Sequence, residues 1–568
     1  MRKEATCIAC VAGLLALLFP GPETAASDRA NDFDAFVERY LEYRWRTDPE
    51  AATRSGVHRY DSILARMSKE DFSARSATLG EFLDETFAFD SKALSHDQQI
   101  DLQLVRSDIR VRREDIDRIR DWQRKPTMYI PFGGLNDLVN GEFATEQERA
   151  RALLARLQQV PRVLGEGRDN LERPPRLFTE TAIRTARQMI PFYEHAIPNF
   201  AERSGYRVSE FRAAAQMAKA ALLDYLEFLE DDLLPRSNGA IAIGKESYNY
   251  LLRELHMLDD DSDSLLKKGE LYFREIEQLL DDTASEIDPD KSWQEITEDI
   301  RADHPSADGL LEAYCDEIQR SRSHVIEQGL VTVPPNEEVR CLDTPPSQRA
   351  FSPFGTFRQP PPFSDSKVGY LILHPIDPDL STDATEKLLR AHDYTWISVI
   401  APHEAYPGHH LQALKAQENP RVFRRVYSAP IFSEGWGLYT EELMYETGFF
   451  RDPQLTRLTQ LRLRLWRAAR IILDTKLHTG QMSYDEARQF LVDNVGFEES
   501  STAGEVNIYV FRPSYAIAYV VGFGQIMKLR DDYRRRKGAA FNLREFHDRL
   551  LTLGSMPIPL ARQLLLPE

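Results

Sequence analysis

Apolar residues recur at helical spacing along most of this chain, and this periodicity constrains its fold more than any other feature. An α-helix returns to the same face every three or four residues, so such spacing predicts helices with one buried side. The predicted helices cover residues 33–41, 95–122, 145–172, 208–232, 262–284, 309–328, 454–478 and 484–494. The predicted fold class is therefore mainly α.

The composition describes a large globular protein with an acidic surface. The 568 residues can bury a large core, in one helical unit or in two closely joined lobes. Hydrophobic residues make up 42% and charged residues 28%, a balance typical of folded proteins. The net charge is −19, whereas nucleic acids and anionic membranes are bound by basic surfaces, so neither is an expected partner. The oligomeric state stays open.

The N-terminus has the layout of a secretory signal. Two basic residues precede an apolar run, 5–19, and small residues follow it. This order predicts a signal peptide at residues 1–26, cleaved near Ala26, and hence a secreted or periplasmic protein. The run is shorter than the roughly 20 residues of a membrane-spanning helix. An uncleaved anchor and a lipoprotein modified at Cys10 are the alternatives.

Two cysteines, Cys315 and Cys341, remain after the predicted cleavage. In an oxidising compartment they could form one disulfide. Two free buried thiols are the alternative, because a sequence gives no distance between them.

Two short runs interrupt the helical pattern. Residues 330–335 and 368–375 are rich in valine, leucine and isoleucine and end in prolines, which is typical of strands. They predict a small sheet around residues 330–375, with Tyr370 as a candidate substrate contact. An edge of this sheet could pair with an extended peptide backbone. A purely structural hairpin is the alternative.

The densest group of metal-ligating side chains lies at residues 401–410, which read Ala-Pro-His-Glu-Ala-Tyr-Pro-Gly-His-His. A second acidic group follows at residues 433–442. Imidazole and carboxylate groups hold a catalytic zinc ion with one position left for water. The sequence therefore predicts one zinc ion per chain, with iron or manganese as alternatives that accept the same ligands.

The spacing of the histidines does not suit a regular helix. Two histidines on one helix share a metal when they are four residues apart. His403 and His409 are six apart, on different faces, while His403 and His410 share a face roughly 10 Å apart along the axis. The Pro-Gly pair before His409 predicts a bulge that brings it beside His403. Pro402 suits a first turn, which predicts that the helix starts here.

A third ligand is expected from a neighbouring helix. Glu434 follows His409 after a turn at Asn419-Pro420 that can send a second helix back past the first. Glu404 is adjacent to a predicted ligand and therefore points elsewhere, which suits a general base that takes a proton from the attacking water. His410 is predicted to support the site, with ligation as the alternative. The predicted metal site falls within residues 395–445.

These residues also carry a resemblance to a known family. The matching pieces are residues 403–412, Gly-Trp-Gly-Leu-Tyr at 435–439, and two segments at 467–478 and 513–519. With them the chain resembles the DUF885 family of bacterial proteins, which look like gluzincin-type metallopeptidases. The resemblance covers nearly all of residues 27–568. Helical gluzincins include the thimet oligopeptidases and the helical zinc carboxypeptidases.

The resemblance implies a large helical metallopeptidase-like fold, with a small sheet next to the active-site helix. It implies that His403, His409 and Glu434 are the zinc ligands and that Glu404 is the base. Two departures stand out. The His-Glu motif carries inserted residues before its second histidine, and Pro-Ser-Tyr-Ala at 513–516 replaces the Pro-Gly-Gln-Ala usual in the family.

Further residues are candidates by type and by resemblance. Tyr519, Tyr515 and His478 could stabilise negative charge on a carbonyl oxygen. For each tyrosine, a buried aromatic ring with a satisfied hydroxyl is the favoured alternative. Arg467 and Arg470 lie three residues apart on one side of a predicted helix, where they could bind a substrate carboxylate. Pairing with internal acids such as Glu441, Glu442 or Asp474 is the favoured alternative.

Together these features predict a zinc-dependent hydrolase, and within that class a peptidase that cleaves oligopeptides. One alternative is a zinc hydrolase of another amide or of an ester. Another is a metal-binding or peptide-binding protein without turnover. Glu404 favours catalysis, because a binding protein needs ligands but no general base.

Overall fold

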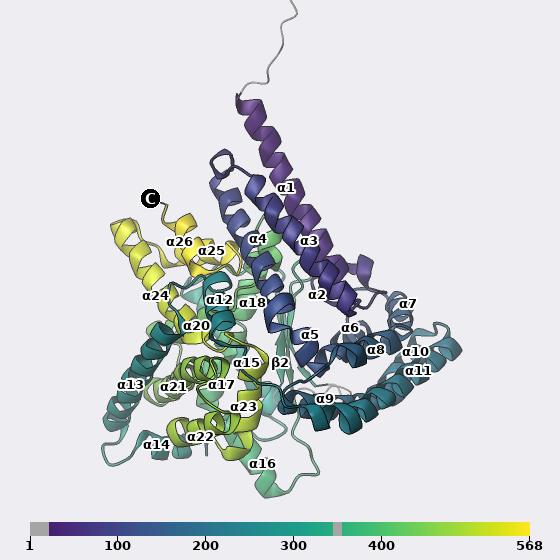
Figure 1. Ribbon diagram of the computed structural model, residues 1–568. Coiled ribbons are helices and arrows are strands. Elements are labelled where there is room, and N and C mark those ends of the chain that lie inside the picture. Colours follow the sequence, from purple (N-terminus) through teal and green to yellow (C-terminus); the bar gives the residue numbers. More distant parts are fainter. Residues whose placement is uncertain (1–21, 345–354, 568) are drawn as a thin grey trace, which may run out of the picture.

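The computed structural model describes residues 22–344 and 355–567 (Figure 1). The apolar run that predicts the signal peptide, and with it Cys10, lies outside these residues. Within the described part of the chain, no helix is both long enough and apolar enough to cross a membrane.

The fold is mainly α, as the periodicity predicts, and a helix lies in every segment where one is expected. These helices are α1 (Pro22–Thr47), α4 (His96–Glu114), α7 (Glu146–Leu157), α8 (Val160–Asn170), α11 (Val208–Glu227), α13 (Ser262–Ile287), α15 (Leu310–Glu327), α21 (Pro453–His478) and α22 (Tyr484–Val495). Segment 145–172 forms two helices rather than one, because Pro161 lies in the first turn of α8 and starts a new helix there.

The remaining α-helices lie wholly or partly outside the segments singled out by the periodicity. They are α2 (Pro49–Arg54), α3 (Lys69–Ala88), α5 (Asp121–Arg124), α6 (Phe132–Asn140), α9 (Arg176–Pro191), α10 (Ile197–Ser204), α12 (Lys245–Glu254), α14 (Trp293–Ile300), α16 (Thr382–Leu389), α17 (Tyr394–Glu404), α18 (His409–Gln417), α19 (Val422–Val426), α20 (Pro430–Glu446), α23 (Glu499–Phe511), α24 (Ala518–Lys537), α25 (Leu543–Thr552) and α26 (Ile558–Leu565).

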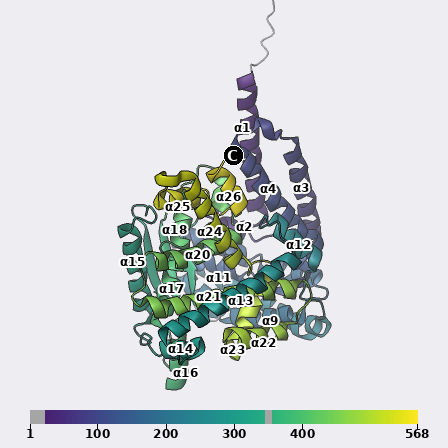
Figure 2. The same ribbon diagram turned by 90° about the vertical axis from the view of Figure 1, so that its left-hand side faces the viewer.

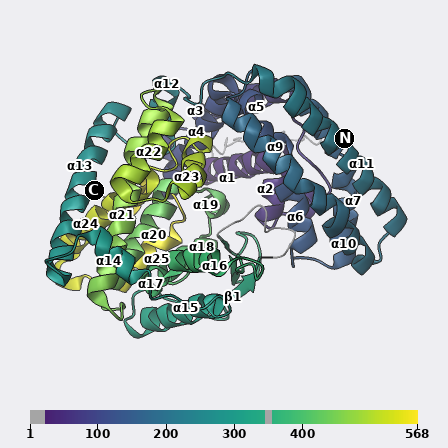
Figure 3. The same ribbon diagram turned by 90° about the horizontal axis from the view of Figure 1, so that it is seen from below.

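The buried apolar side chains form two clusters. The smaller cluster comes from residues 64–233, and the larger one joins α1, α3 and α4 to most of the chain after residue 248. Figure 3 shows α6 to α11 on one side of the molecule and α13, α20, α21 and α24 on the other. The predicted metal site belongs to the larger cluster.

Long helices pack side by side in the larger cluster. α13 packs against α21, and α20 packs against α24 (Figure 2). The second pair meets at two glycines, since a Cβ on Gly435 would lie only 2.5 Å from the backbone of Gly522. Backbones this close require glycine, which explains the first glycine of the Gly-Trp-Gly motif.

The sheet has three strands, β1 (Glu338–Asp343), β2 (Thr356–Arg358) and β3 (Val368–Leu373). β3 is central, parallel to β1 and antiparallel to β2. β3 lies next to α18, because a Cβ on Gly369 would lie 2.5 Å from Nδ1 of His410, and the ring of Phe357 on β2 packs 6.0 Å from the His410 ring. The second predicted strand run is thus confirmed as β3.

The first predicted strand run, residues 330–335, is wrong, since the strand beside β3 begins only at Glu338. The polar groups of this run bind side chains of α25 instead of a neighbouring strand. The carbonyl of Leu330 accepts a hydrogen bond from His547, and the backbone N–H of Thr332 donates one to Asp548. The two prolines that follow offer no N–H groups for a ladder.

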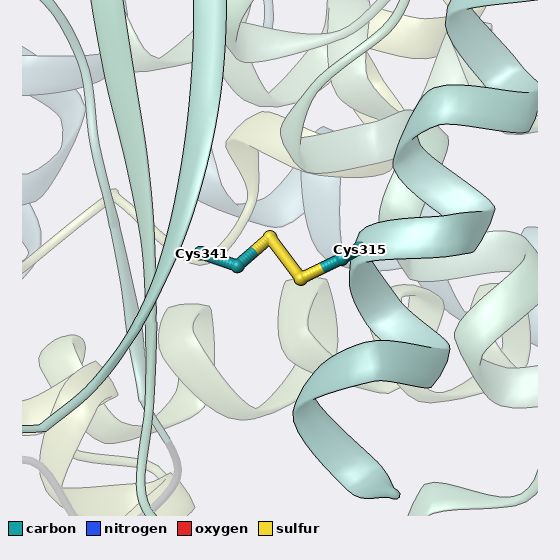
Figure 4. The surroundings of a disulfide bond; sticks show 2 residues. All are labelled: Cys315 and Cys341. Atoms are coloured by element: carbon teal, nitrogen blue, oxygen red, sulfur yellow. A yellow bond between two sulfur atoms is a disulfide. The ribbon is translucent and has the colours of Figure 1, made fainter.

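A disulfide joins Cys315 of α15 to Cys341 of β1, with their Cα atoms 6.2 Å apart (Figure 4). The alternative of two free thiols is therefore wrong. The bond ties the sheet to a helix that packs against α17, on which His403 lies.

Candidate metal centre

The first predicted ligand lies at the end of a helix, not at its start. α17 begins at Tyr394, where the Asp393 side chain accepts a hydrogen bond from the backbone N–H of Trp396. Pro402 lies inside this helix, so the prediction that the helix starts at the site is wrong. The reason is the N-cap at Asp393, which starts the helix two turns earlier. His403 therefore occupies the last turn of α17.

The Pro-Gly pair breaks the helix completely instead of forming a bulge within it. Residues 405–408 are not helical, and α18 starts at His409. A Cβ on Gly408 would lie 1.8 Å from the carbonyl oxygen of His403, so only glycine permits so tight a connection. The break places the rings of His403 and His409 4.9 Å apart and perpendicular to each other.

The third predicted ligand reaches the same point from α20. The chain turns at Asn419-Pro420, passes through α19 and returns as α20, which packs against α17. The Glu434 Oε2 atom lies 3.9 Å from Nε2 of His403 and 3.7 Å from Nε2 of His409. One ligand atom from each of the three residues lies within 4.8 Å of the other two. The structure thus brings the predicted ligand set together.

Each histidine ring is held by its other nitrogen. Nδ1 of His403 lies 2.8 Å from a carboxylate oxygen of Glu441, and Nδ1 of His409 lies 3.3 Å from the amide oxygen of Gln412. The Gln412 amide donates in turn to Ser555, which turns its oxygen toward His409. Both acceptors favour the tautomer with the proton on Nδ1, which leaves a lone pair on each Nε2.

The donor set fits a zinc ion. Two imidazole nitrogens and one carboxylate, each oriented by a hydrogen-bonding neighbour, are the ligands of a catalytic zinc site with an open position. The rings also have little freedom to turn away, since a Cβ on Gly437 would lie 2.5 Å from the His403 ring. Zinc itself stays a prediction.

The group is buried and strongly coupled. Burial disfavours the charge of Glu434, but hydrogen bonding to His409 prevails and lowers the pKa of Glu434 to about 2. Burial likewise opposes a charged imidazole, but Glu434 raises the pKa of His409 to about 9. Without a metal, a positive charge on His409 therefore compensates Glu434, and a bound cation would take over that role.

Two predicted tyrosines accompany the ligand group. The hydroxyl of Tyr515 donates a hydrogen bond of 2.5 Å to Oε1 of Glu434. The ring of Tyr519 lies 6.1 Å from that of Tyr515. Burial raises the pKa of both phenols, so each hydroxyl keeps its proton and can donate a hydrogen bond. Glu404 lies nearby, and its charge contributes to the raised pKa of His409.

His478 does not join them. Its Nε2 atom lies 2.9 Å from the carbonyl oxygen of Tyr509, and its side chain is fully buried. It is eleven residues after Arg467 on α21, which is roughly 16 Å along the helix axis. The structure therefore does not bring His478 together with the ligand group, and its contacts are those of a buried structural residue.

The predicted substrate-binding residues are also engaged elsewhere. Nη2 of Arg467 lies 3.4 Å from Glu441, and Nη2 of Arg470 lies 2.8 Å from Glu505. Both arginines are buried, so internal pairing holds instead of substrate binding. The Tyr370 hydroxyl donates a hydrogen bond of 2.8 Å to Glu142, which lies within the residues that form the smaller cluster, 64–233. In the structure all three side chains are thus engaged by carboxylates of the protein itself.

His410 is turned away from the ligand group. Its Nε2 atom lies 3.1 Å from a carboxylate oxygen of Glu337, which also accepts hydrogen bonds from Tyr406 and Arg322. These four residues are called the Glu337 network below. The alternative of His410 as a ligand finds no support in this arrangement.

Sequence reasoning missed three supporting residues, Glu441, Gln412 and Glu337. Helical spacing could have indicated the first two. Glu441 follows Glu434 by two helical turns, and Gln412 follows His409 by one, so each shares a face with a ligand. Glu337 gave no such signal, because it lies far from the motif in the sequence.

Comparison with known proteins gives one family match along most of the chain. A family model described as a bacterial protein of unknown function, DUF885, matches residues 49–565. No protein with a curated description matches.

Two solved structures share the fold. A candidate lipoprotein of unknown function from Shewanella oneidensis has a TM-score of 0.79 at 22% identity, and the match covers 94% of this chain and 99% of that one. A candidate lipoprotein from Colwellia psychrerythraea has a TM-score of 0.82 at 18% identity, covering 94% and 98%. A candidate oligoendopeptidase F from Bacillus anthracis reaches a TM-score of only 0.26 at 11% identity, covering 89% and 96%, which is too low to support a conclusion.

Proposed function

We propose that this chain, which belongs to the DUF885 family of bacterial proteins, is a zinc-dependent hydrolase that cleaves peptide bonds in oligopeptides. The observation that carries the proposal is the convergence of Nε2 of His403, Nε2 of His409 and the Glu434 carboxylate, with Glu404 beside them. Zinc held there would polarise the scissile carbonyl and make water a better nucleophile.

The residues around the ligands have distinct roles in this proposal. Glu404 follows His403 directly and is partly exposed, so it can accept a proton from the attacking water and pass it to the leaving amine. The Tyr515 hydroxyl donates its hydrogen bond to Glu434 and so holds that ligand in place. Tyr519, whose phenol stays protonated, donates a hydrogen bond to the oxygen on which negative charge develops.

Two observations favour a location of this protein outside the cytoplasm. The disulfide between Cys315 and Cys341 is expected in an oxidising compartment. The structurally similar proteins are described as candidate lipoproteins. We infer that the N-terminal segment directs export to the periplasm or the exterior, and the intact mass of the exported protein distinguishes cleavage near Ala26 from lipid modification at Cys10.

The test compares zinc-loaded wild type with Glu404→Gln on a mixture of random-sequence tetrapeptides, with products identified by mass spectrometry. The wild type should hydrolyse peptide bonds, and Glu404→Gln should lose about 10²–10⁴-fold in rate, the usual contribution of a general base. Zinc content should be about one per chain in both proteins. The absence of peptide hydrolysis by the zinc-loaded wild type, or an equal rate in the variant, would refute the proposal.

A further inference from the structure

One exposed arginine lies beside the candidate metal centre. Arg512 follows the last residue of α23, and its guanidinium carbon lies 5.3 Å from the centre of the Tyr515 ring. The hydroxyl of that tyrosine donates to Glu434. Arg512 is thus separated from a candidate metal ligand by a single side chain.

The turn that carries both residues is held from inside the protein. Ser514 adopts a left-handed backbone conformation, with φ 63°, which residues other than glycine rarely adopt. Its Oγ atom lies 3.1 Å from Nε2 of the buried His256. The backbone N–H of Ser514 donates a hydrogen bond to the buried Asp474. Burial raises the pKa of Asp474 to about 8, although this hydrogen bond and one from Tyr248 act to lower it. These buried partners fix the backbone between Arg512 and Tyr515.

Arg512 differs from the arginines that the sequence singled out. Arg467 and Arg470 are buried and paired with Glu441 and Glu505. Arg512 is exposed, and within residues 22–344 and 355–567 no carboxylate lies within ion-pair distance of it. Its planar guanidinium therefore keeps its donors free, in the geometry that binds a carboxylate with two parallel hydrogen bonds.

The distance suits a short peptide. The path from the Arg512 guanidinium across the Tyr515 ring to Glu434 is at most about 11 Å, which is the span of about three extended residues. A carboxylate bound at Arg512 would thus leave a peptide bond one to three residues away at the candidate metal centre.

We propose that Arg512 binds a carboxylate of the substrate, so that the protein prefers peptides with a carboxylate within about three residues of the cleaved bond. This inference rests on the proposed peptidase function and adds the substrate class to it. The carboxylate can belong to the peptide C-terminus or to an acidic side chain.

The kinetic test uses three random tetrapeptide libraries with zinc-loaded protein. The first lacks Asp and Glu and has a free C-terminus, the second is its C-terminal amide, and the third is an amidated library that contains Glu. Wild type should cleave the first or third library about tenfold or more faster than the second, because a charge-assisted hydrogen bond is lost with the carboxylate. Which of the two is cleaved identifies the source of the carboxylate.

Arg512→Gln should remove this preference, and Arg512→Lys should keep part of it as a point charge. Arg151→Gln is the matched control, because Arg151 is exposed on α7, within the smaller cluster's half of the chain, and has no salt bridge among the described residues. Equal cleavage of all three libraries by wild type, or an unchanged preference in Arg512→Gln, would overturn the inference.

A second readout does not depend on turnover. Phenylglyoxal modifies accessible guanidinium groups, and mass spectrometry locates the label. In Glu404→Gln, the first or third library should slow labelling of Arg512 about fivefold or more while Arg151 is unaffected, and the second library should slow neither. Equal labelling of Arg512 with all libraries would contradict carboxylate binding. If zinc-loaded wild type cleaves no library, the proposed function fails, and the labelling still decides whether Arg512 binds carboxylates.

Discussion

Two adjacent histidines, His409 and His410, enter two different buried networks. His409 faces His403 and Glu434, while His410 faces Glu337. Successive residues of a helix point about 100° apart, which is why neighbours in sequence separate here. Both networks contain histidine, glutamate and tyrosine, so composition does not distinguish them.

The difference lies in what each carboxylate receives. Glu337 accepts hydrogen bonds from His410, Tyr406 and Arg322, and these protein donors satisfy a carboxylate without any ion. At the candidate metal centre, the Nδ1 atoms are engaged by Glu441 and Gln412. The Nε2 atoms of both histidines face Oε2 of Glu434 at 3.9 and 3.7 Å, while Oε1 accepts the hydrogen bond from Tyr515. Three ligand atoms that converge on one point in this way could hold a metal ion, whereas the mere presence of histidine and glutamate does not suffice.

Removal of single residues from each network should have the largest and most different effects on metal content. His403→Ala and Glu434→Ala should reduce zinc from about one per chain to almost none, since each removes one of three ligands. His410→Gln should keep about one zinc, because its side chain binds Glu337 instead. Elemental analysis of the purified proteins measures this. Zinc retained in Glu434→Ala, or lost in His410→Gln, would contradict the assignment.

The next largest effect concerns the group behind His403. Glu441→Gln should weaken zinc binding about 10- to 100-fold, the usual effect of replacing a partner of a ligand histidine. Glu442→Gln is the matched control, because the neighbouring carboxylate pairs with Arg457 and Arg464. Competition with a chelator of known affinity gives both constants. Equal affinities in the two variants would show that Glu441 does not orient the ligand.

The Glu337 network should respond in stability instead of metal content. Glu337→Gln leaves buried donors poorly matched, so the free energy of unfolding should fall by about 1–3 kcal/mol while zinc content is unchanged. Glu338→Gln, at an exposed neighbour in β1, should change stability by less than about 0.5 kcal/mol. Denaturant unfolding of the zinc-loaded proteins tests this. Loss of zinc from Glu337→Gln would contradict the prediction, because it would show that the Glu337 network also supports metal binding.

The smallest effect is a pH dependence of that stability. Burial opposes the charge of Glu337, but hydrogen bonds from His410, Tyr406 and Arg322 lower its pKa below the ordinary 4.5. A carboxylate with a lowered folded-state pKa stabilises the protein above its unfolded pKa, and this contribution is lost as pH falls through the folded value. The stability difference between wild type and Glu337→Gln should therefore shrink below about pH 4.5. A constant difference down to pH 3 would contradict this account.

Most of the fold could be predicted because it depends on local patterns. Every segment with apolar residues at helical spacing contains a helix, since the spacing alone defines a face to bury. Predictions failed where long-range contacts replaced local preference. Residues 330–335 have a strand-like composition, yet α25 supplies their hydrogen-bond partners.

The candidate site divides in the same way. The sequence is sufficient to point to His403, Glu434, Glu404 and the His409-His410 pair, because their types and spacing are rare together. It could not settle which of the two histidines joins the group or where the arginines lie, since those outcomes depend on which carboxylate each side chain meets. Arg467 and Arg470 have the right chemistry for a substrate carboxylate, but Glu441 and Glu505 lie within their reach.

The helices, an irregularity at Pro407-Gly408 and a candidate set of metal ligands can be predicted without any structure, since each follows from the chemistry of neighbouring residues. That the irregularity is a complete break between two helices became clear only from the fold. The packing of distant elements sets which ring nitrogens face Glu434 and which are engaged by other protein groups. It placed Glu441 behind His403, Glu337 beside His410, and Arg512 at an exposed edge of the site. These pairings depend on the packing of helices and strands from distant parts of the chain, which no local pattern records.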